Sequence, residues 1–401
     1  MISTEQALQL ILCNTVNGNI VEVHPAQALN QVLAASVKSK IHSPGFDQSS
    51  MDGYAIRFED LNTNSLNVIG EVITGNAPQT KMKNGCCLRI FTGAMVPKRA
   101  DTIVIKENTI YENNSIKILD PLAVRLGANI RLKASQIKKG EEALPEGHII
   151  NPASIGYLTM LGMDKIKIYQ SPSIAILVTG SELRAPGEKL NPGEIFESNS
   201  YTLNAALQSM HLKAKKIVKV KDELKSVERA ISKAMEIADI ILITGGISAG
   251  NYDFVEPALN TVGVKKIFHK VAQKPGRPLY FGVKQNQLFF GLPGNPSSVL
   301  SCFYEYVYPA LRKLCGFKNY TLPTSKLQLK NVYEKKSPLT HFLKGYASGN
   351  QVEILSSQES YLLNSFAKAN CLVVIPAEQL IVKENEWVEV HYIDSLNQTA
   401  R

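Results

Sequence analysis

Three glycine-rich turns with basic residues between them are the part of this sequence best suited to chemistry. They are TGG at 244–246, KPGRP at 274–278 and GLPGNPSS at 291–298. Apolar, strand-like runs precede the first and last turns (239–246 and 279–294), and helical periodicity follows both. Backbone N–H groups at such strand-to-helix turns can bind an anion. The segment therefore predicts a pocket for a multiply charged anionic ligand at the carboxyl ends of parallel strands.

Fixed positive charge lies beside these turns. Lys270, Lys274 and Arg277 are within eight residues of one another, and the planar guanidinium of an arginine suits phosphate. One such turn is usually only a turn, and Lys270 alone could be a surface lysine. The three turns together with these cations favour a ligand site.

The elements that must hold the turns alternate between strands and helices. Within 173–316, strands are predicted at 173–180, 213–220 and 239–246, and helices at 199–210 and 226–238. This alternation is typical of a doubly wound α/β sheet whose ligand loops lie at one edge.

Other patterns flank this region. Helices are predicted at 3–14, 24–38 and 152–163, and short strands separated by Gly, Asn and Pro turns fill 41–126. Strand patterns return over 317–401 and indicate a β-barrel or sandwich. A chain of 401 residues is also too long for one typical core. We therefore expect several domains.

Composition narrows the function classes. Hydrophobic residues make up 44% and charged residues 20%, as in ordinary globular proteins. The net charge of +9 suits an acidic ligand, but the basic clusters are short, so nucleic-acid binding is not expected. The six cysteines lack metal-ligand spacing and predict reduced thiols in the cytoplasm. No export signal or membrane span is expected.

The motifs together resemble those of the molybdopterin molybdenumtransferases, the MoeA or gephyrin E-domain family. The resemblance runs from about residue 5 to at least 315 and rests on the three turns and on further motifs in family order. These further motifs are PGFDQSSMDGYAIR (44–57), RIFTGAMVPKRADTIVIKE (89–107), NIR (129–131), ILVTGSEL (176–183) and IFESNSYTL (195–203).

The resemblance implies a fold of four domains. Residues 1–40 and 127–172 would form a discontinuous N-terminal helical domain, into which a β domain of residues 41–126 is inserted. Residues 173–316 would form a MogA-like, molybdopterin-binding α/β domain, and residues 317–401 a C-terminal β-barrel.

The family's chemistry is the insertion of molybdate into adenylated molybdopterin with release of AMP, which gives molybdenum cofactor. The resemblance thus implies a Mg²⁺-dependent transferase with adenylated molybdopterin and molybdate as substrates. It also implies a homodimer in which the N-terminal domains of one subunit close the cleft of the other. The adenylating enzyme of the pathway and apo-molybdoenzymes would be its partners.

Site residues are carried over from the family's motifs position by position. Catalysis is assigned to Asp52, Thr92, Glu182, Asp222, Asp253, Lys270 and Lys274. Substrate binding is assigned to Gly245, Gly246, Ser248, Pro275, Gly276, Arg277, Pro293, Gly294, Asn295, Pro296, Ser297, Lys344 and Ser360. Asp222 and Asp253 would hold the metal, although an aspartate at a helix start, as at 253, is often only an N-cap.

Three departures from the family pattern could affect the rate of the transferase reaction. Gln136 and Ser181 stand where the family has carboxylates, and Lys344 replaces an arginine expected to meet the oxoanion. The amide of Gln136 cannot act as a base. The ammonium of Lys344 is a point charge and lacks the paired N–H donors of an arginine guanidinium. An alternative is therefore a paralogue that binds molybdopterin or its adenylate as a carrier or scaffold. A smaller alternative is a nucleotide pyrophosphatase, which the SSMDGYA segment (49–55) argues against.

Overall fold

The computed structural model describes residues 1–247 and 253–393. The chain forms two units that are each dense in internal contacts. Unit 1 consists of Met1–Val21, Asn30–Ala34 and Lys167–Arg401, and unit 2 of Glu22–Leu29 and Ala35–Ile166. The finer division into four domains stays a prediction.

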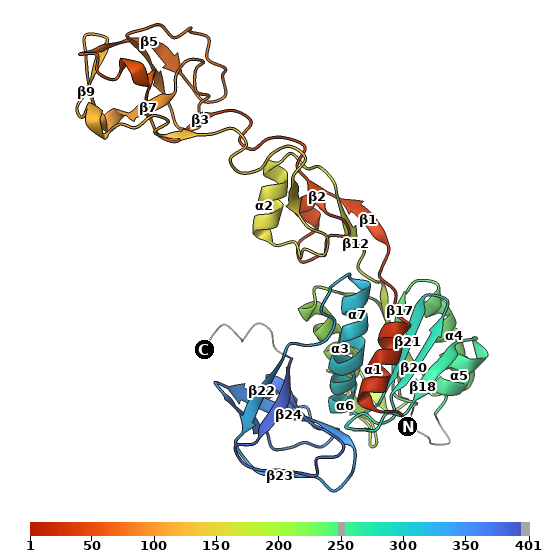
Figure 1. Cartoon of the computed structure of the whole chain (residues 1–401). Coiled ribbons are helices and arrows are strands. Elements are labelled where there is room, and N and C mark those ends of the chain that lie inside the picture. The colour runs from red at the N-terminus through yellow and green to blue at the C-terminus, as the bar shows by residue number, and fades with distance from the viewer. Residues whose placement is uncertain (248–252, 394–401) are drawn as a thin grey trace. The chain divides into compact units, whose positions relative to one another are not determined.

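Unit 1 contains a six-stranded sheet (Figure 1). Its strand order is β16 (Ala214–Val220), β13 (Ile174–Thr179), β17 (Ile240–Thr244), β21 (Gln287–Leu292), β20 (Tyr280–Lys284) and β18 (Lys265–His269). The first four strands run parallel, whereas β20 and β18 are antiparallel to their neighbours. The apolar run at 279–294 is therefore a hairpin and not one strand. It turns at Gln285, whose φ of 53° is left-handed.

Helices cover both faces of this sheet, which confirms the doubly wound α/β fold. One face packs against α1 (Thr4–Cys13), α3 (Asn199–Ser209), α6 (Pro296–Cys302), the π-helix η5 (Phe303–Val307) and α7 (Tyr308–Leu314). The other packs against α4 (Leu224–Met235) and α5 (Val255–Thr261). Alternate residues of β13 enter the two cores, as expected for a central strand buried on both sides.

The C-terminal part of unit 1 is a closed barrel, as predicted. Its strand order is β24 (Thr340–Ser348), β25 (Gln351–Ile354), β22 (Thr324–Leu329), β28 (Trp387–Tyr392) and β26 (Cys371–Ile375), and β26 pairs back to β24. The short strand β19 (Gln273–Lys274) runs parallel to β24, with Lys274 opposite His341. The KPGRP turn is therefore hydrogen-bonded to the barrel.

Unit 2 contains the predicted strand-rich region. Its largest sheet has the order β7 (Thr102–Ile105), β4 (Gly53–Ile56), β6 (Cys86–Ile90), β5 (Leu66–Val72), β9 (Ser115–Ile118) and β8 (Thr109–Glu112). The helix expected at 152–163 is α2 (Pro152–Met160), which begins with an Asn151 capping box.

The prediction of a helix at 24–38 is wrong. The segment has one short 3-10 turn, η1 (Pro25–Gln27), and ends in β2 (Val37–Lys38), which pairs with β11 (Glu142–Leu144). Ala34 also donates its N–H to the Lys167 carbonyl at 2.9 Å. Hydrogen bonds to distant segments thus override the local helical propensity.

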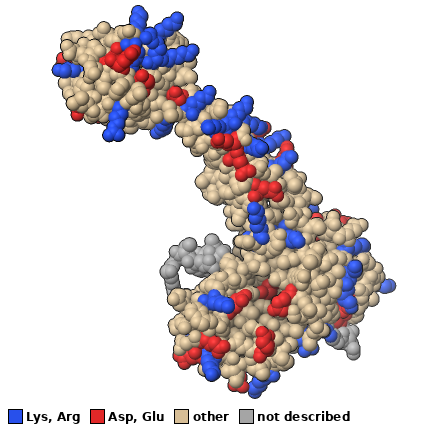
Figure 2. Space-filling model, viewed as in Figure 1, with Lys and Arg blue, Asp and Glu red and all other residues tan. Residues whose placement is uncertain are grey.

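On the face shown in Figure 2, basic and acidic side chains are interspersed. Of the helices in the described part of the chain, none has the length and apolar character needed to cross a membrane.

Candidate active site

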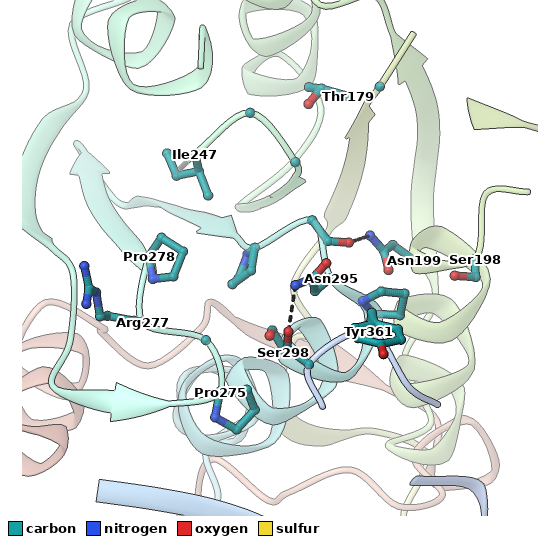
Figure 3. Close-up of a pocket in the computed structure, with 18 of the residues that line it drawn as sticks. Thr179, Ser198, Asn199, Ile247, Pro275, Arg277, Pro278, Asn295, Ser298 and Tyr361 are labelled. Carbon is teal, nitrogen blue, oxygen red and sulfur yellow. Dashed lines mark hydrogen bonds between the residues drawn. The ribbon is translucent and has the colours of Figure 1, made fainter. Parts of the chain in front are cut away.

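A cavity of about 870 Å³ lies in unit 1 where β13, β17 and β21 end (Figure 3). These strands are neighbours and parallel, so their following loops meet at one edge of the sheet. The predicted site residues that line the cavity are Glu182, Asp222, Gly245, Gly246, Asp253, Lys274, Pro275, Gly276, Arg277, Pro293, Gly294, Asn295, Pro296 and Ser360.

Close backbone packing requires glycine at position 245. Gly245 has a φ of 84°, and a Cβ added there would lie 2.6 Å from the Thr179 carbonyl oxygen at the end of β13. A Cβ on Gly294 would lie 3.8 Å from the Gly245 Cα, so the TGG and GLPGNP turns are adjacent. A side chain at Gly245 would force the ends of β13 and β17 apart.

The KPGRP turn brings Lys274 and Arg277, both exposed, to the cavity. The buried amide of Gln273 holds this turn, since its Nε2 donates to the Pro275 carbonyl at 3.0 Å and to that of Gly276 at 3.3 Å. The Tyr306 hydroxyl in turn donates to Gln273 Oε1. The two cations therefore stand on a turn fixed from within the core.

Carboxylates line the same cavity. Glu182 follows β13, Asp222 follows β16, and Asp253 precedes α5. Asp222 Oδ2 accepts a hydrogen bond from the Ser181 N–H at 2.9 Å. Ser181, one of the three departures from the family pattern, therefore orients this carboxylate through its backbone. The cavity thus offers cationic and anionic groups from different loops.

The Ser360 loop closes on the GLPGNP turn. Asn295 Nδ2 donates to Ser360 Oγ at 2.7 Å, and the Ser297 N–H donates to the Ser360 carbonyl at 3.1 Å. Tyr361, next in this loop, also lines the cavity. The barrel therefore supplies part of the cavity wall.

Several predicted residues are not in the cavity lining. Lys270, the fully buried Ser297 and Lys344 lie outside it. The Lys344 side chain is 2% exposed, and its Nζ donates to the carbonyls of Ser357, Glu359 and Leu362 at 2.8, 3.3 and 3.2 Å. Burial lowers the pKa of this ammonium, although the nearby Glu359 opposes that effect. Its contacts support the Ser360 loop.

The remaining predicted residues are Asp52, Thr92 and Ser248. Asp52 and Thr92 belong to unit 2, where Asp52 Oδ1 accepts the Thr92 N–H and its hydroxyl, each at 2.8 Å. These two hydrogen bonds lower the pKa of the Asp52 carboxyl group. Ser248 lies outside the described residues.

Sequence reasoning missed several lining residues. Glu197 and Asn199 lie in the IFESNSYTL motif, yet no residue of that motif was assigned a role. Gln273 and Tyr361 also line the cavity. Gln273 carries no charge to mark it, whereas Tyr361 adjoins the assigned Ser360 and could have been found from that position.

Comparison with known proteins extends over nearly the whole chain. Residues 2–162 match the MoeA N-terminal region (domain I and II), 175–313 a probable molybdopterin binding domain, and 326–393 the MoeA C-terminal region (domain IV). A molybdopterin molybdenumtransferase of Haemophilus influenzae is 34% identical over 378 residues, which cover 92% of this chain and 93% of the relative. The chain belongs to the MoeA family.

Relatives agree with this assignment in sequence and in structure. The Staphylococcus aureus (strain Mu50) molybdopterin molybdenumtransferase is 30% identical over 98% of this chain and 96% of its own length. The crystal structure of a molybdopterin biosynthesis MoeA protein from Pyrococcus horikosii superposes with a TM-score of 0.85 at 29% identity, covering 98% of this chain and 99% of that one. This MoeA protein is thus a transferase of molybdenum cofactor biosynthesis.

Proposed function

We propose that the protein inserts molybdate into adenylated molybdopterin and releases AMP. The observation that carries the proposal is the convergence of Lys274, Arg277 and the two glycine turns on one cavity large enough for a nucleotide-sized ligand. The relatives named molybdopterin molybdenumtransferase support the same reaction.

The anionic parts of the substrates would lie against the KPGRP turn. Lys274 and Arg277 would hold the phosphates and the molybdate, and Arg277 can donate two parallel N–H groups to one oxoanion. Both cations stabilise negative charge that moves onto AMP as it leaves. The adjacent TGG and GLPGNP turns allow close approach of the ligand to the backbone.

The balance of charge in the cavity fits a divalent cation. Of the described residues that line the cavity, four are acidic (Glu182, Glu197, Asp222 and Asp253) and two are basic (Lys274 and Arg277). A ligand with several negative charges would be repelled by this excess unless a cation offset it. In residues 1–247 and 253–393 no group of three or more His, Cys, Asp or Glu side chains is placed to hold a metal.

Mg²⁺ fits such a sparse donor set, because it commonly binds one or two carboxylates together with waters and substrate phosphates. We propose Asp222 and Asp253 as those carboxylates. The ion would neutralise the phosphates that join the two halves of the adenylate. Asp222 is already oriented by the Ser181 N–H.

Other parts of the proposal concern the assembly. Asp52 and Thr92 are in the other unit, so a homodimer in which one subunit supplies them to the partner's cavity would complete the site. The adenylating enzyme and apo-molybdoenzymes would be its partners. We propose the cytoplasm as its location, since all six cysteines are free thiols.

The test combines purified protein with adenylated molybdopterin, molybdate and Mg²⁺. AMP release that depends on molybdate, together with reconstitution of an apo-molybdoenzyme, would support the transferase. Tight binding of the adenylate without AMP release would contradict it and favour a carrier. A Lys274→Met, Arg277→Met double variant serves as the control that should bind neither anion.

A further inference from the structure

Asn199 is the first residue of α3 and a buried polar residue of the cavity wall, with 8% of its surface exposed. Its Nδ2 donates to the Gly294 carbonyl at 2.8 Å (Figure 3). This bond fixes the orientation of the amide, because a flipped amide would place oxygen against oxygen. Oδ1 therefore points away from Gly294.

Asn199 Oδ1 is buried, and among the described residues no group donates a hydrogen bond to it. A buried acceptor without a partner is costly, and native proteins rarely leave one in this state. The atom belongs to a residue that lines a ligand-sized cavity. A hydrogen-bond donor on the ligand would remove that cost.

The surroundings of Asn199 favour a donor over an anion. The Glu197 carboxylate, 8% exposed, accepts the N–H of Ser200 at 2.8 Å and its hydroxyl, so a protein carboxylate already occupies the start of α3. Glu197 also lines the cavity. This wall is thus an acceptor wall, defined by Glu197 and Asn199.

The acceptor wall is separate from the cationic turn. Figure 3 shows Asn199 at one side of the cavity and Arg277 at the other. A ligand that spans the cavity would place its phosphates at Arg277 and Lys274 and its other end near Asn199. The adenylate of the proposed function has this polarity, since its phosphates join groups that end in amino-bearing heterocycles.

We propose that Asn199 is a specificity-determining residue whose Oδ1 accepts a hydrogen bond from the amino group of the substrate's heterocycle. The inference rests on the proposed function and deepens it, because it says which end of the substrate the α3 wall recognises. Pterin and adenine both carry an amino group on a fused ring, and the experiment distinguishes them. A site built around a hydrogen bond to an N–H rejects analogues that lack it.

The experiment measures binding of two ligand pairs by calorimetry in the presence of Mg²⁺. The first pair is AMP and IMP, and the second is 6-hydroxymethylpterin phosphate and its lumazine counterpart. In each pair an oxo group replaces the amino group. The wild-type protein should bind the amino member of one pair about tenfold or more tightly than the oxo member. The pair that discriminates identifies the ring at Asn199.

The Asn199→Ala variant separates recognition from support of the Gly294 turn. In this variant the ratio of the two affinities within the discriminating pair should fall to about one. Loss of support for the Gly294 turn alone would weaken the binding of both ligands equally and leave that ratio unchanged. If this variant does not fold, the wild-type ratios still decide. Equal binding within both pairs would overturn the inference while leaving the proposed function standing. Failure of the wild-type protein to bind any of the four ligands would instead contradict the proposed function.

Discussion

Asp253 is the residue on which the proposed metal role depends most directly. Replacing it with Asn keeps the shape but removes the charge that would hold Mg²⁺. AMP release should fall by about a hundredfold or more, the scale typical for loss of a group that stabilises transition-state charge. The measurement is the rate of AMP release against Mg²⁺ concentration.

The matched control for Asp253→Asn is Glu384→Gln, which removes one carboxylate from the exposed surface of the barrel. Glu384→Gln should leave the rate unchanged, and circular dichroism should show both variants folded. An Asp253→Asn protein with wild-type activity would exclude Asp253 from the metal role.

Lys344 illustrates how a residue expected at the ligand can act through a loop. Its ammonium donates to three carbonyls of the loop that carries Ser360. Lys344→Met should lower the free energy of unfolding by about 1–3 kcal/mol, because three loop carbonyls would lose their charged donor. Denaturant titration measures this, with the exposed Lys368→Met as the control.

A second measurement on Lys344→Met decides between the two roles of this lysine. Loop support predicts weaker molybdate binding together with lower stability. Direct contact with the oxoanion, as the family resemblance implies, predicts weaker molybdate binding at unchanged stability. The second pattern would contradict the role drawn from the structure.

At the scale of elements, an ion pair links the barrel to the α/β layer within unit 1. His391 on β28 contacts Glu305 on the π-helix η5 at 2.9 Å and Glu389 at 2.9 Å. Burial disfavours the charged imidazolium, but the Glu305 and Glu389 carboxylates together outweigh it and raise the pKa of His391 from 6.5 to about 9. The pair therefore stabilises the folded state when His391 is protonated.

This raised pKa predicts how stability changes with pH. The contribution is fully present below the unfolded pKa near 6.5 and is lost as pH rises through about 9. His391→Gln should lower the free energy of unfolding at pH 6 by up to about 3 kcal/mol. The difference from wild type should shrink by pH 10. Denaturant titrations at both pH values test this, and a difference that does not change with pH would contradict it.

The sequence predicted those elements whose signals are local. The helix at 3–14 has a capping box between Ser3 and Gln6, and the structure has α1 there. The segment at 24–38 has a helical pattern too, but its hydrogen bonds go to Glu142–Leu144 and to Lys167, which no local pattern reveals. Long-range pairing therefore explains the error.

The same distinction applies to the site. Lys274, Arg277 and the glycine turns could be predicted because charge and backbone freedom are visible in the sequence. The importance of Asn199 follows from its bond to Gly294, which lies 95 residues away. Only the folded chain shows that its Oδ1 is left without a donor among the described residues.

At the scale of the whole molecule, the proposed dimer predicts complementation between inactive variants. Asp52→Asn and Asp253→Asn remove residues of different units. If the cavity of one subunit is completed by Asp52 of its partner, a mixed dimer has one intact site. Half of the dimers are mixed after random exchange, so about a quarter of the wild-type activity should return.

The complementation experiment mixes the two variants under conditions that allow subunit exchange and then measures AMP release. Each variant alone is the control and should be inactive. Activity that stays absent after exchange, when mass analysis shows that mixed dimers have formed, would mean that each site is completed within one chain.

The central claim is that this cavity transfers molybdate to adenylated molybdopterin, and AMP release tests it most directly. The protein is mixed with the adenylate and Mg²⁺, and AMP is followed with and without molybdate. The account predicts that molybdate triggers AMP release and that the product reconstitutes an apo-molybdoenzyme. Adenylate that binds but stays intact in the presence of molybdate would contradict the account.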